Sequence, residues 1–132
     1  MKTGDPCPCG SGRSYGACCG PLHGGQPAAS AEALMRSRYS AYVLGLEDYL
    51  LATWHSSTRP QGLDLAAEPA PKWLGLEVKR HLSLDDSHAV VEFVARYRVA
   101  GRGQRLHETS RFVREEGRWF YVDGDFDGKA PG

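Results

Sequence analysis

All four cysteines of this 132-residue chain lie between positions 7 and 20, in the stretch C-P-C-G-S-G-R-S-Y-G-A-C-C-G. A chain of this length can bury a hydrophobic core of its own, so the cysteines are not needed to replace one. A cluster of thiols this compact can form disulfide bonds, carry out redox chemistry or bind a metal ion. The cellular compartment and the spacing of the cysteines help to choose between these roles.

The sequence predicts a cytoplasmic protein. Its N-terminal segment, M-K-T-G-D-P-C, lacks the apolar region of an export signal, and no apolar run is long enough to span a bilayer, so we expect no membrane partner. Lys and Arg together number 16, as do Asp and Glu, so the overall charge gives no specific signal for nucleic acid. Because the cytosol keeps thiols reduced, cysteine clusters there more often bind metals or act in catalysis than form disulfides.

The spacing of the cysteines favours a metal site. Cys7 and Cys9 are nearly adjacent and Cys18 and Cys19 are adjacent, so local disulfides would be strained and would close very little chain. Redox sites favour a C-x-x-C pair at the start of a helix, whereas this glycine-rich stretch contains C-x-C and C-C. Two close pairs of thiolates can instead converge on one tetrahedral zinc ion from both ends of an eight-residue loop. With four protein ligands, such a zinc ion is structural.

Residues around the cysteines also suit a zinc site. Gly10, Gly12 and Gly16 allow the backbone to turn tightly around a metal ion. Arg13 can offset part of the formal charge of about minus two that Zn²⁺ and four thiolates carry. Because two adjacent residues need an unusual turn to direct both sulfurs at one ion, His23 is an alternative fourth ligand. The competing interpretation of His23 is a solvated loop residue.

The remaining sequence predicts helices followed by strands. Residues 31–43 have the apolar spacing of an amphipathic helix, with Ser30 as its N-cap, and Gly45 separates them from a second helical stretch at residues 46–54. Extended runs joined by short turns follow at residues 73–84, 88–99, 104–115 and 118–123. This order predicts an α+β fold in which a curved antiparallel sheet wraps around the helices.

Two families resemble parts of the chain. The stretch from Cys7 to Gly20 resembles the SEC-C motif, the zinc module of the SecA translocation motor, whose pattern is C-x-C-x8-C followed by His or Cys; Cys19 holds that last position here. The segments G-P-L-H-G-G, A-L-M-R-S-R-Y-S-A-Y, T-W-H, E-T-S-R-F and R-W-F-Y-V-D-G are similar to the YchJ family of small uncharacterised bacterial proteins. That resemblance implies a SEC-C zinc motif over residues 1–25. It also implies, over residues 26–132, an α+β cone of the nuclear transport factor two-like (cystatin-like) type, without an established activity.

Aromatic and ionisable side chains of the helices and strands can converge in the concave sheet and form a pocket. The candidate pocket residues are Arg38, Tyr42, Trp54, His55, Glu92, His107, Glu108 and Arg111. The competing interpretation is that the charged residues lie on solvated faces and the aromatic residues pack in the core. The segment D-G-D-F-D-G, with aspartates at 123, 125 and 127, resembles a calcium loop but lacks the closing glutamate, so we expect a solvated tail there.

Two classes of function remain open. In the first, which we favour from the sequence, the zinc knuckle is a rigid surface that docks on a protein or ribosomal partner, as the resemblance to SecA implies. In the second, the cone binds a small molecule or performs acid/base chemistry. The sequence contains no nucleophile with a base, no phosphate-binding loop and no open metal site, so we assign no catalytic residue. A deep pocket in which Arg38, Trp54 and Glu108 converge would favour the second class.

The first predicted helix contains two arginines with different environments. Arg36 and Arg38 point roughly 200° apart around the helix, and Arg38 falls on its apolar stripe. An unpaired buried guanidinium costs several kcal/mol. We therefore expect Arg38 to be buried and hydrogen-bonded to a backbone carbonyl or to a carboxylate such as that of Glu92 or Glu108.

Overall fold

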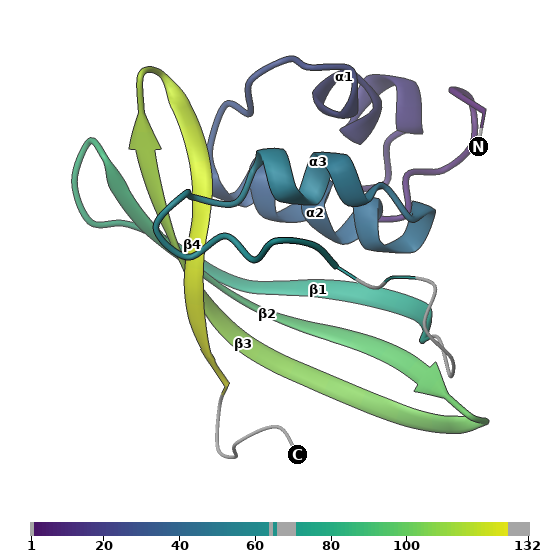
Figure 1. The fold of residues 1–132 in the computed structure, drawn as a ribbon. Coiled ribbons are helices and arrows are strands. Elements are labelled where there is room, and N and C mark those ends of the chain that lie inside the picture. Colours follow the sequence, from purple (N-terminus) through teal and green to yellow (C-terminus); the bar gives the residue numbers. More distant parts are fainter. Residues whose placement is uncertain (1, 64, 66–70, 127–132) are drawn as a thin grey trace.

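The computed structural model describes residues 2–63, 65 and 71–126, in which helices pack on one face of an antiparallel sheet (Figure 1). The helical elements are η1 (Tyr15–Ala17), α1 (Cys19–His23), α2 (Ala31–Leu44) and α3 (Glu47–Ala52). The strands are β1 (Lys72–Ser83), β2 (His88–Val99), β3 (Arg102–Glu115) and β4 (Arg118–Phe126). Helices precede strands along the chain, as the sequence predicted, and the α+β class is confirmed.

The sheet is a meander in the order β1-β2-β3-β4, in which each strand pairs antiparallel with the next. Two tight turns connect its last three strands, and both residues of each turn, Ala100-Gly101 and Glu116-Gly117, have positive φ angles. This is the conformation that matches the twist of a β-hairpin. Bulges interrupt the β1–β2 and β3–β4 pairings, and bulges increase the local twist. The sheet accordingly curves around the helical layer (Figure 1).

The last strand extends further than the sequence predicted. Residues 124–126 continue β4 beyond Asp123, so Asp125 lies in a strand and not in a solvated tail. The physical reason is a pairing with β3, in which the guanidinium of Arg111 binds the carboxylates of both Asp123 and Asp125. Asp127 lies outside the described residues.

Helix α2 begins and ends as its sequence predicts. The Ser30 hydroxyl accepts a hydrogen bond from the Ala33 amide at 3.1 Å, which satisfies one of the free N–H groups of the first turn. The helix ends at Gly45, whose φ of 73° is the left-handed conformation that glycine adopts most readily. Between these caps, α2 lies across the concave side of the sheet, with α1 on its other side (Figure 1).

One hydrophobic core includes the N-terminal segment as well as the helices and strands. Its buried members include Leu34 and Met35 of α2, Val91 and Phe93 of β2, Phe112 of β3, and the N-terminal cysteines Cys7, Cys9 and Cys19. The segment before residue 26 therefore shares its packing with the rest of the chain. The predicted division into residues 1–25 and 26–132 stays a prediction.

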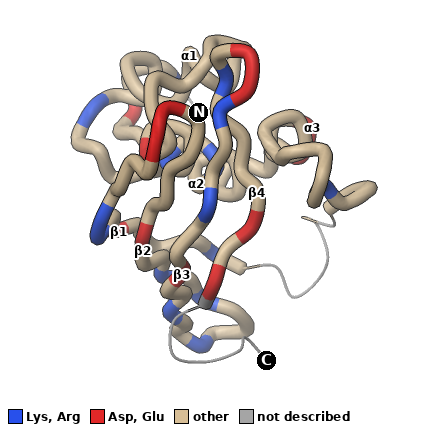
Figure 2. The backbone as a smooth tube through the Cα atoms, turned by 90° about the vertical axis from the view of Figure 1, so that its left-hand side faces the viewer, with Lys and Arg blue, Asp and Glu red and all other residues tan. Residues whose placement is uncertain are grey.

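The outer face of the sheet is charged and solvated. Basic and acidic residues occur side by side along the strands (Figure 2), and ion pairs such as Glu77 with Lys79 and Glu77 with Arg96 are half exposed. Exposed pairs of this kind contribute little stability. None of the described helices is both long and apolar enough to cross a membrane.

A buried arginine joins α2 to α3. Arg38 is only 6% exposed, and its Nη1 donates hydrogen bonds to the Leu50 carbonyl at 2.8 Å and to the Thr53 hydroxyl at 2.7 Å. The guanidinium carbon also lies 5.0 Å and 4.7 Å from the ring centres of Trp54 and Tyr121, within the range of cation–π attraction. Burial and a backbone carbonyl partner are thus confirmed for Arg38.

We predict that Arg38→Ala lowers the free energy of unfolding by about 2 to 4 kcal/mol, because it removes the link between α2 and α3 and leaves the Leu50 carbonyl with only its longer contact of 3.3 Å to the Thr53 hydroxyl. Arg96→Ala is the matched control: Arg96 is about half exposed on the outer face, and its loss should change stability by less than about 0.5 kcal/mol. Urea unfolding followed by circular dichroism measures both. Equal stability of the Arg38→Ala variant and the wild type would contradict a structural role for the buried guanidinium.

Candidate metal centre and cavity

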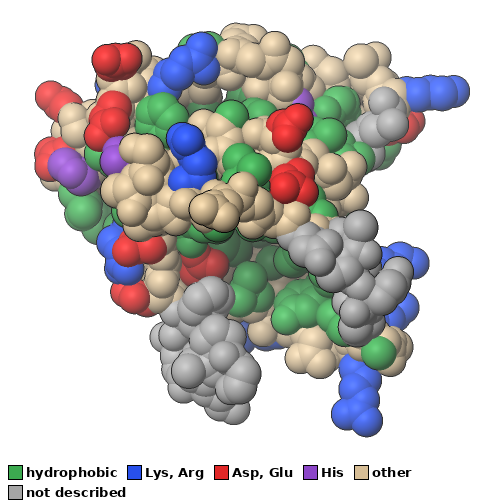
Figure 3. Space-filling view, in the orientation of Figure 1, with side chains coloured by type: hydrophobic (Ala, Val, Ile, Leu, Met, Phe, Trp, Pro, Cys, Tyr) green, Lys and Arg blue, Asp and Glu red, His purple; other side chains and the backbone are tan. Residues whose placement is uncertain are grey.

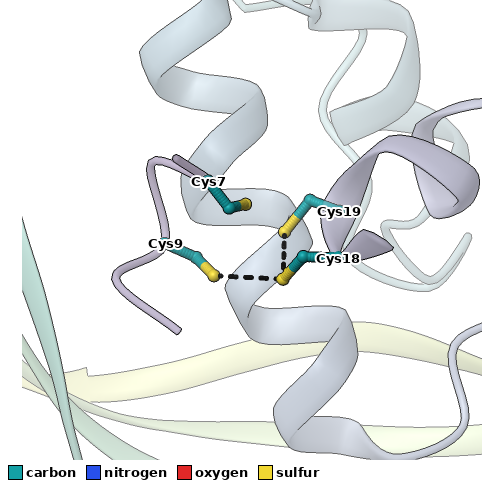
Figure 4. A group of neighbouring side chains, drawn as sticks. All are labelled: Cys7, Cys9, Cys18 and Cys19. Atoms are coloured by element: carbon teal, nitrogen blue, oxygen red, sulfur yellow. Dashed lines mark hydrogen bonds between the residues drawn. The ribbon is translucent and has the colours of Figure 1, made fainter. Parts of the chain in front are cut away.

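The four cysteine side chains point toward one another beside α2 (Figure 4). Their sulfur atoms all lie within 4.8 Å of one another, with 3.5 Å between Cys9 and Cys18 and 3.9 Å between Cys18 and Cys19. Four sulfurs about 2.3 Å from a tetrahedral zinc ion are separated by about 3.8 Å. The donor set and its spacing therefore fit a four-coordinate metal ion.

Local backbone turns bring the two pairs of cysteines together. After Cys9, Gly10 and Gly12 have φ angles of 76° and 86°, a conformation that residues with a side chain rarely adopt. Between η1 and α1, Cys18 has φ and ψ angles of −131° and −101°, outside the regular helix and strand regions. This is the unusual turn that adjacent ligands require, and it directs the sulfurs of Cys18 and Cys19 to the same place.

Helix α2 holds the cysteine cluster from one side. The Ser40 hydroxyl lies 3.4 Å from the sulfur of Cys19 and 3.7 Å from that of Cys7. One turn earlier, Arg36 donates to the Cys9 carbonyl at 2.9 Å. Hydrogen bonds of this kind orient metal ligands and reduce the negative charge that they carry. Because Ser40 is fully buried, its contacts with Cys7 and Cys19 lie away from water.

Cys18 is the least buried of the four cysteines and receives its hydrogen bonds from its own loop. The Ser11 hydroxyl lies 3.1 Å from the Cys18 sulfur, and the Arg13 guanidinium lies 3.8 Å from it. The guanidinium therefore lies near the cysteines, as the sequence predicted. It is close enough to offset part of the charge of a metal–thiolate cluster.

The contact between Cys9 and Cys19 shifts the pKa values of the two thiols in opposite directions. It lowers the pKa of Cys9 to about 4, and the same contact, together with burial, raises the pKa of Cys19. Because metal-binding cysteines must be thiolates, a metal ion bound here would compete with protons and bind more weakly as the pH falls.

His23, the alternative fourth ligand, has hydrogen-bond partners at both ring nitrogens. Its Nε2 lies 2.8 Å from the Ser37 carbonyl, and its Nδ1 lies 2.6 Å from the Tyr15 hydroxyl. Burial lowers the pKa of His23, which favours the neutral ring. A carbonyl can only accept, so Nε2 carries the proton and Nδ1 accepts from Tyr15. Both ring nitrogens are thus engaged, and His23 fastens α1 to α2 while the four sulfurs face one another.

A cavity of about 360 Å³ lies between α2 and the inner face of the sheet. Small-molecule pockets commonly enclose about 300 to 1,000 Å³, so its size suits a small ligand. Four candidate pocket residues, Arg38, Tyr42, Trp54 and Glu108, line it. Hydrophobic side chains are visible in the hollow between the helical layer and the sheet (Figure 3).

Glu108 places a carboxylate inside this cavity. It is 7% exposed, and its Oε2 accepts hydrogen bonds from Ser110 at 2.7 Å and from Tyr121 at 3.2 Å. Burial and the nearby charge of Glu108 raise the pKa of Tyr121, so its hydroxyl stays protonated and donates. Gly124, opposite Ser110 on β4, leaves room for the carboxylate, because a Cβ atom there would overlap with it.

The other four candidates lie outside the cavity. Glu92, His107 and Arg111 have the opposite strand parity from Phe93 and Glu108, so they project from the outer face, where His107 donates to Glu92 at 2.7 Å. Arg111 binds the two β4 aspartates.

His55 follows α3 and does not reach the cavity either. Its Nε2 lies 2.9 Å from the Glu115 carboxylate, and its Nδ1 lies 2.7 Å from the Ser57 hydroxyl. Both ring nitrogens therefore have partners, one in the segment after α3 and one at the end of β3.

Sequence reasoning missed part of the cavity wall. Alternation along β3 could have found Leu106 and Phe112, which share the face of Glu108. The position of Tyr121 on the cavity wall could then have been inferred, because Tyr121 pairs with Phe112 across the β3–β4 hairpin. The position of Trp73 on the cavity wall could not have been inferred in this way, since it depends on how α2 lies over β1.

A four-cysteine cluster joined to helices on a curved antiparallel sheet defines a SEC-C motif protein with a nuclear transport factor two-like domain. The SEC-C motif model matches residues 5–21, and the model described as "YchJ, middle NTF2-like domain" matches residues 30–124. The chain belongs to the YchJ family.

Curated relatives and solved structures agree with this assignment. The chain is 62% identical to a UPF0225 protein of Polaromonas naphthalenivorans, over 91% of this chain and 96% of the relative. It is 60% identical to another of Ralstonia nicotianae, over 90% of each chain. A SEC-C motif protein of Rhodopseudomonas palustris, solved in solution, has a TM-score of 0.79 at 41% identity, over 90% of this chain and 96% of that one. A crystal structure of a SEC-C motif protein from Psychrobacter arcticus has a TM-score of 0.79 at 30% identity, over 99% and 88%.

Proposed function

We propose that this protein binds a small molecule in the cavity of its cone and that a structural zinc ion fixes its N-terminal segment against α2. The observation that carries the proposal is the cavity of about 360 Å³ in which Arg38, Trp54 and Glu108 converge. A close-packed core leaves no space of this size, and two buried charges on its wall are costly for folding alone. The proposal therefore differs from the function that the sequence first favoured.

Zinc is the metal that best suits the cysteine cluster. Four thiolates in a tetrahedral arrangement are typical of structural zinc sites, and Cys7, Cys9, Cys18 and Cys19 would hold the ion. With four protein ligands the ion has no position for water or substrate, so it cross-links the chain. Its role in function is then to hold the loop of residues 7–19 on one side of α2.

Docking of this zinc-binding segment on a protein or ribosomal partner stays a prediction from the resemblance to SecA. It is compatible with a ligand in the cone, because the cavity lies on a different side of α2 from the cysteines. The side chains of Arg36 and Ser40 contact the N-terminal segment, whereas Arg38 and Tyr42 line the cavity.

For the metal, we predict one zinc ion per chain with four sulfur ligands about 2.3 Å away, measured by X-ray absorption at the zinc edge. A His23→Gln variant should keep the same four-sulfur signal, because His23 bonds to Tyr15 and Ser37 and not to the metal. A nitrogen ligand in the wild type that disappears in this variant would assign the fourth position to His23.

For the cavity, we predict that indole, as a probe of shape, binds and shifts the NMR signals of residues that line it. Ala95 is fully buried on the cavity wall, so Ala95→Leu should fill the space and weaken indole binding at least about tenfold. Arg96→Leu, one residue later on the outer face, is the matched control and should leave binding unchanged. Indole binding that is absent from the wild type, or equal in both variants, would contradict a ligand site here.

A further inference from the structure

Two opposite charges lie on the cavity wall without pairing with each other. Arg38 and Glu108 are both more than nine-tenths buried, and the ion pairs found among the described residues do not include one between them. Burying a charge costs free energy that hydrogen bonds or an opposite charge must offset. A ligand that lies between the two groups can supply that compensation to both.

Arg38 keeps hydrogen-bond donors for such a ligand. Its bonds to Leu50 and Thr53 both start from Nη1, and no bond from Nε or Nη2 to another described residue accompanies them. The described residues contain no fully buried side-chain nitrogen or oxygen without a partner. The remaining donors of Arg38 are therefore accessible, and the accessible space that Arg38 borders is the cavity.

Glu108 keeps an acceptor in the same way. Ser110 and Tyr121 both donate to Oε2, which fixes the orientation of the carboxylate and leaves Oε1 as the oxygen for a further donor. Because Gly124 has no side chain, the carboxylate can lie close to β4 without a clash. The cavity wall thus presents one fixed donor group and one fixed acceptor group.

The remaining wall is aromatic and favours a flat ligand. Two aromatic pairs line it: Tyr42 and Trp73 lie 5.8 Å apart between ring centres, and Trp54 and Tyr121 lie 5.1 Å apart. Phe93 and Phe112 add to this surface. Aromatic rings at these distances pack well against the faces or edges of another ring. The polar part of a ligand is then directed to Arg38 and Glu108.

We infer that the cavity binds a neutral, planar aromatic compound with an amide group, whose oxygen accepts from Arg38 and whose N–H donates to Glu108. The inference rests on the proposed ligand-binding function and specifies its ligand class. A carboxylate ligand would meet Glu108 as a like charge, and a cationic ligand would meet Arg38 in the same way. An amide avoids both conflicts and satisfies both groups. The lactam edge of a fused heterocycle offers the same donor and acceptor.

Three ligands of nearly equal shape test this inference: 2-naphthamide, 2-naphthoate and 2-naphthamidine. The amide head group offers both a hydrogen-bond donor and an acceptor. The carboxylate offers only acceptors and carries a negative charge, whereas the amidinium offers only donors and carries a positive charge. Calorimetry and NMR titration of the zinc-loaded full chain should show that the amide binds at least about tenfold more tightly than either charged ligand. This factor corresponds to one hydrogen bond to a charged group.

Glu108→Gln is the decisive variant, because it keeps the shape of the side chain but replaces the anion with a neutral amide. In this variant the preference for 2-naphthamide over 2-naphthoate should fall about tenfold or reverse, since the naphthoate no longer meets a like charge. Glu92→Gln, on the outer face of the neighbouring strand, is the matched control and should keep the wild-type order. Circular dichroism establishes that both variants fold.

The outcomes separate this inference from the proposed function. Tighter binding of naphthoate would make the cavity an anion site, and tighter binding of naphthamidine would make it a cation site. Either result, or equal binding of all three, overturns the amide assignment. If indole binds and none of the three does, the inference alone fails. If neither indole nor any of the three binds, the ligand-binding function itself fails.

Discussion

The structure depends on α2, which is held by a different set of contacts on each side. On one side Arg36 and Ser40 contact the cysteine segment, and on the other Arg38 crosses to the backbone of α3. A single 14-residue helix thus contacts the cysteine cluster and forms one wall of the cavity. Isolated helices of this length are marginal in water, so its stability comes from these packed sides.

The arrangement gives the cysteine cluster a structural role in a small protein of this kind. The cysteine segment contains few regular elements, and three of its cysteines lie in the main core. The thiols share this core with Leu34 and Met35 of α2. A bound metal ion would hold the thiols in these positions. The opposite side of α2 borders the cavity.

The convergence of the four cysteines and the order of elements could be predicted from the sequence because both depend on local patterns. Cysteine spacing, the Ser30 cap, Gly45 and the alternation along the strands are each properties of a few neighbouring residues. Arg38 was also predictable, since its place on the apolar stripe required burial. Its partner was not: Leu50 and Thr53 became partners only through the angle between α2 and α3.

The residues of the cavity wall could be predicted only in part, because some of them depend on tertiary packing. Glu108 and His107 are adjacent in the sequence, yet they lie on opposite faces of the sheet, and strand alternation alone distinguishes them. The strand pattern does not reveal which face of the sheet the helices cover, or that they leave a cavity over that face. Tyr121 and Trp73 enter the cavity wall through that tertiary packing.

Amide hydrogen exchange of the zinc-loaded and chelated protein tests the central claim that the metal cluster positions α2. The account predicts that metal removal exposes residues 2–25 and lowers protection along α2, while β2 and β3 in the centre of the sheet stay protected. Unchanged protection of α2 after complete metal removal would show that the helix, and the cavity that it borders, do not depend on the cysteine cluster.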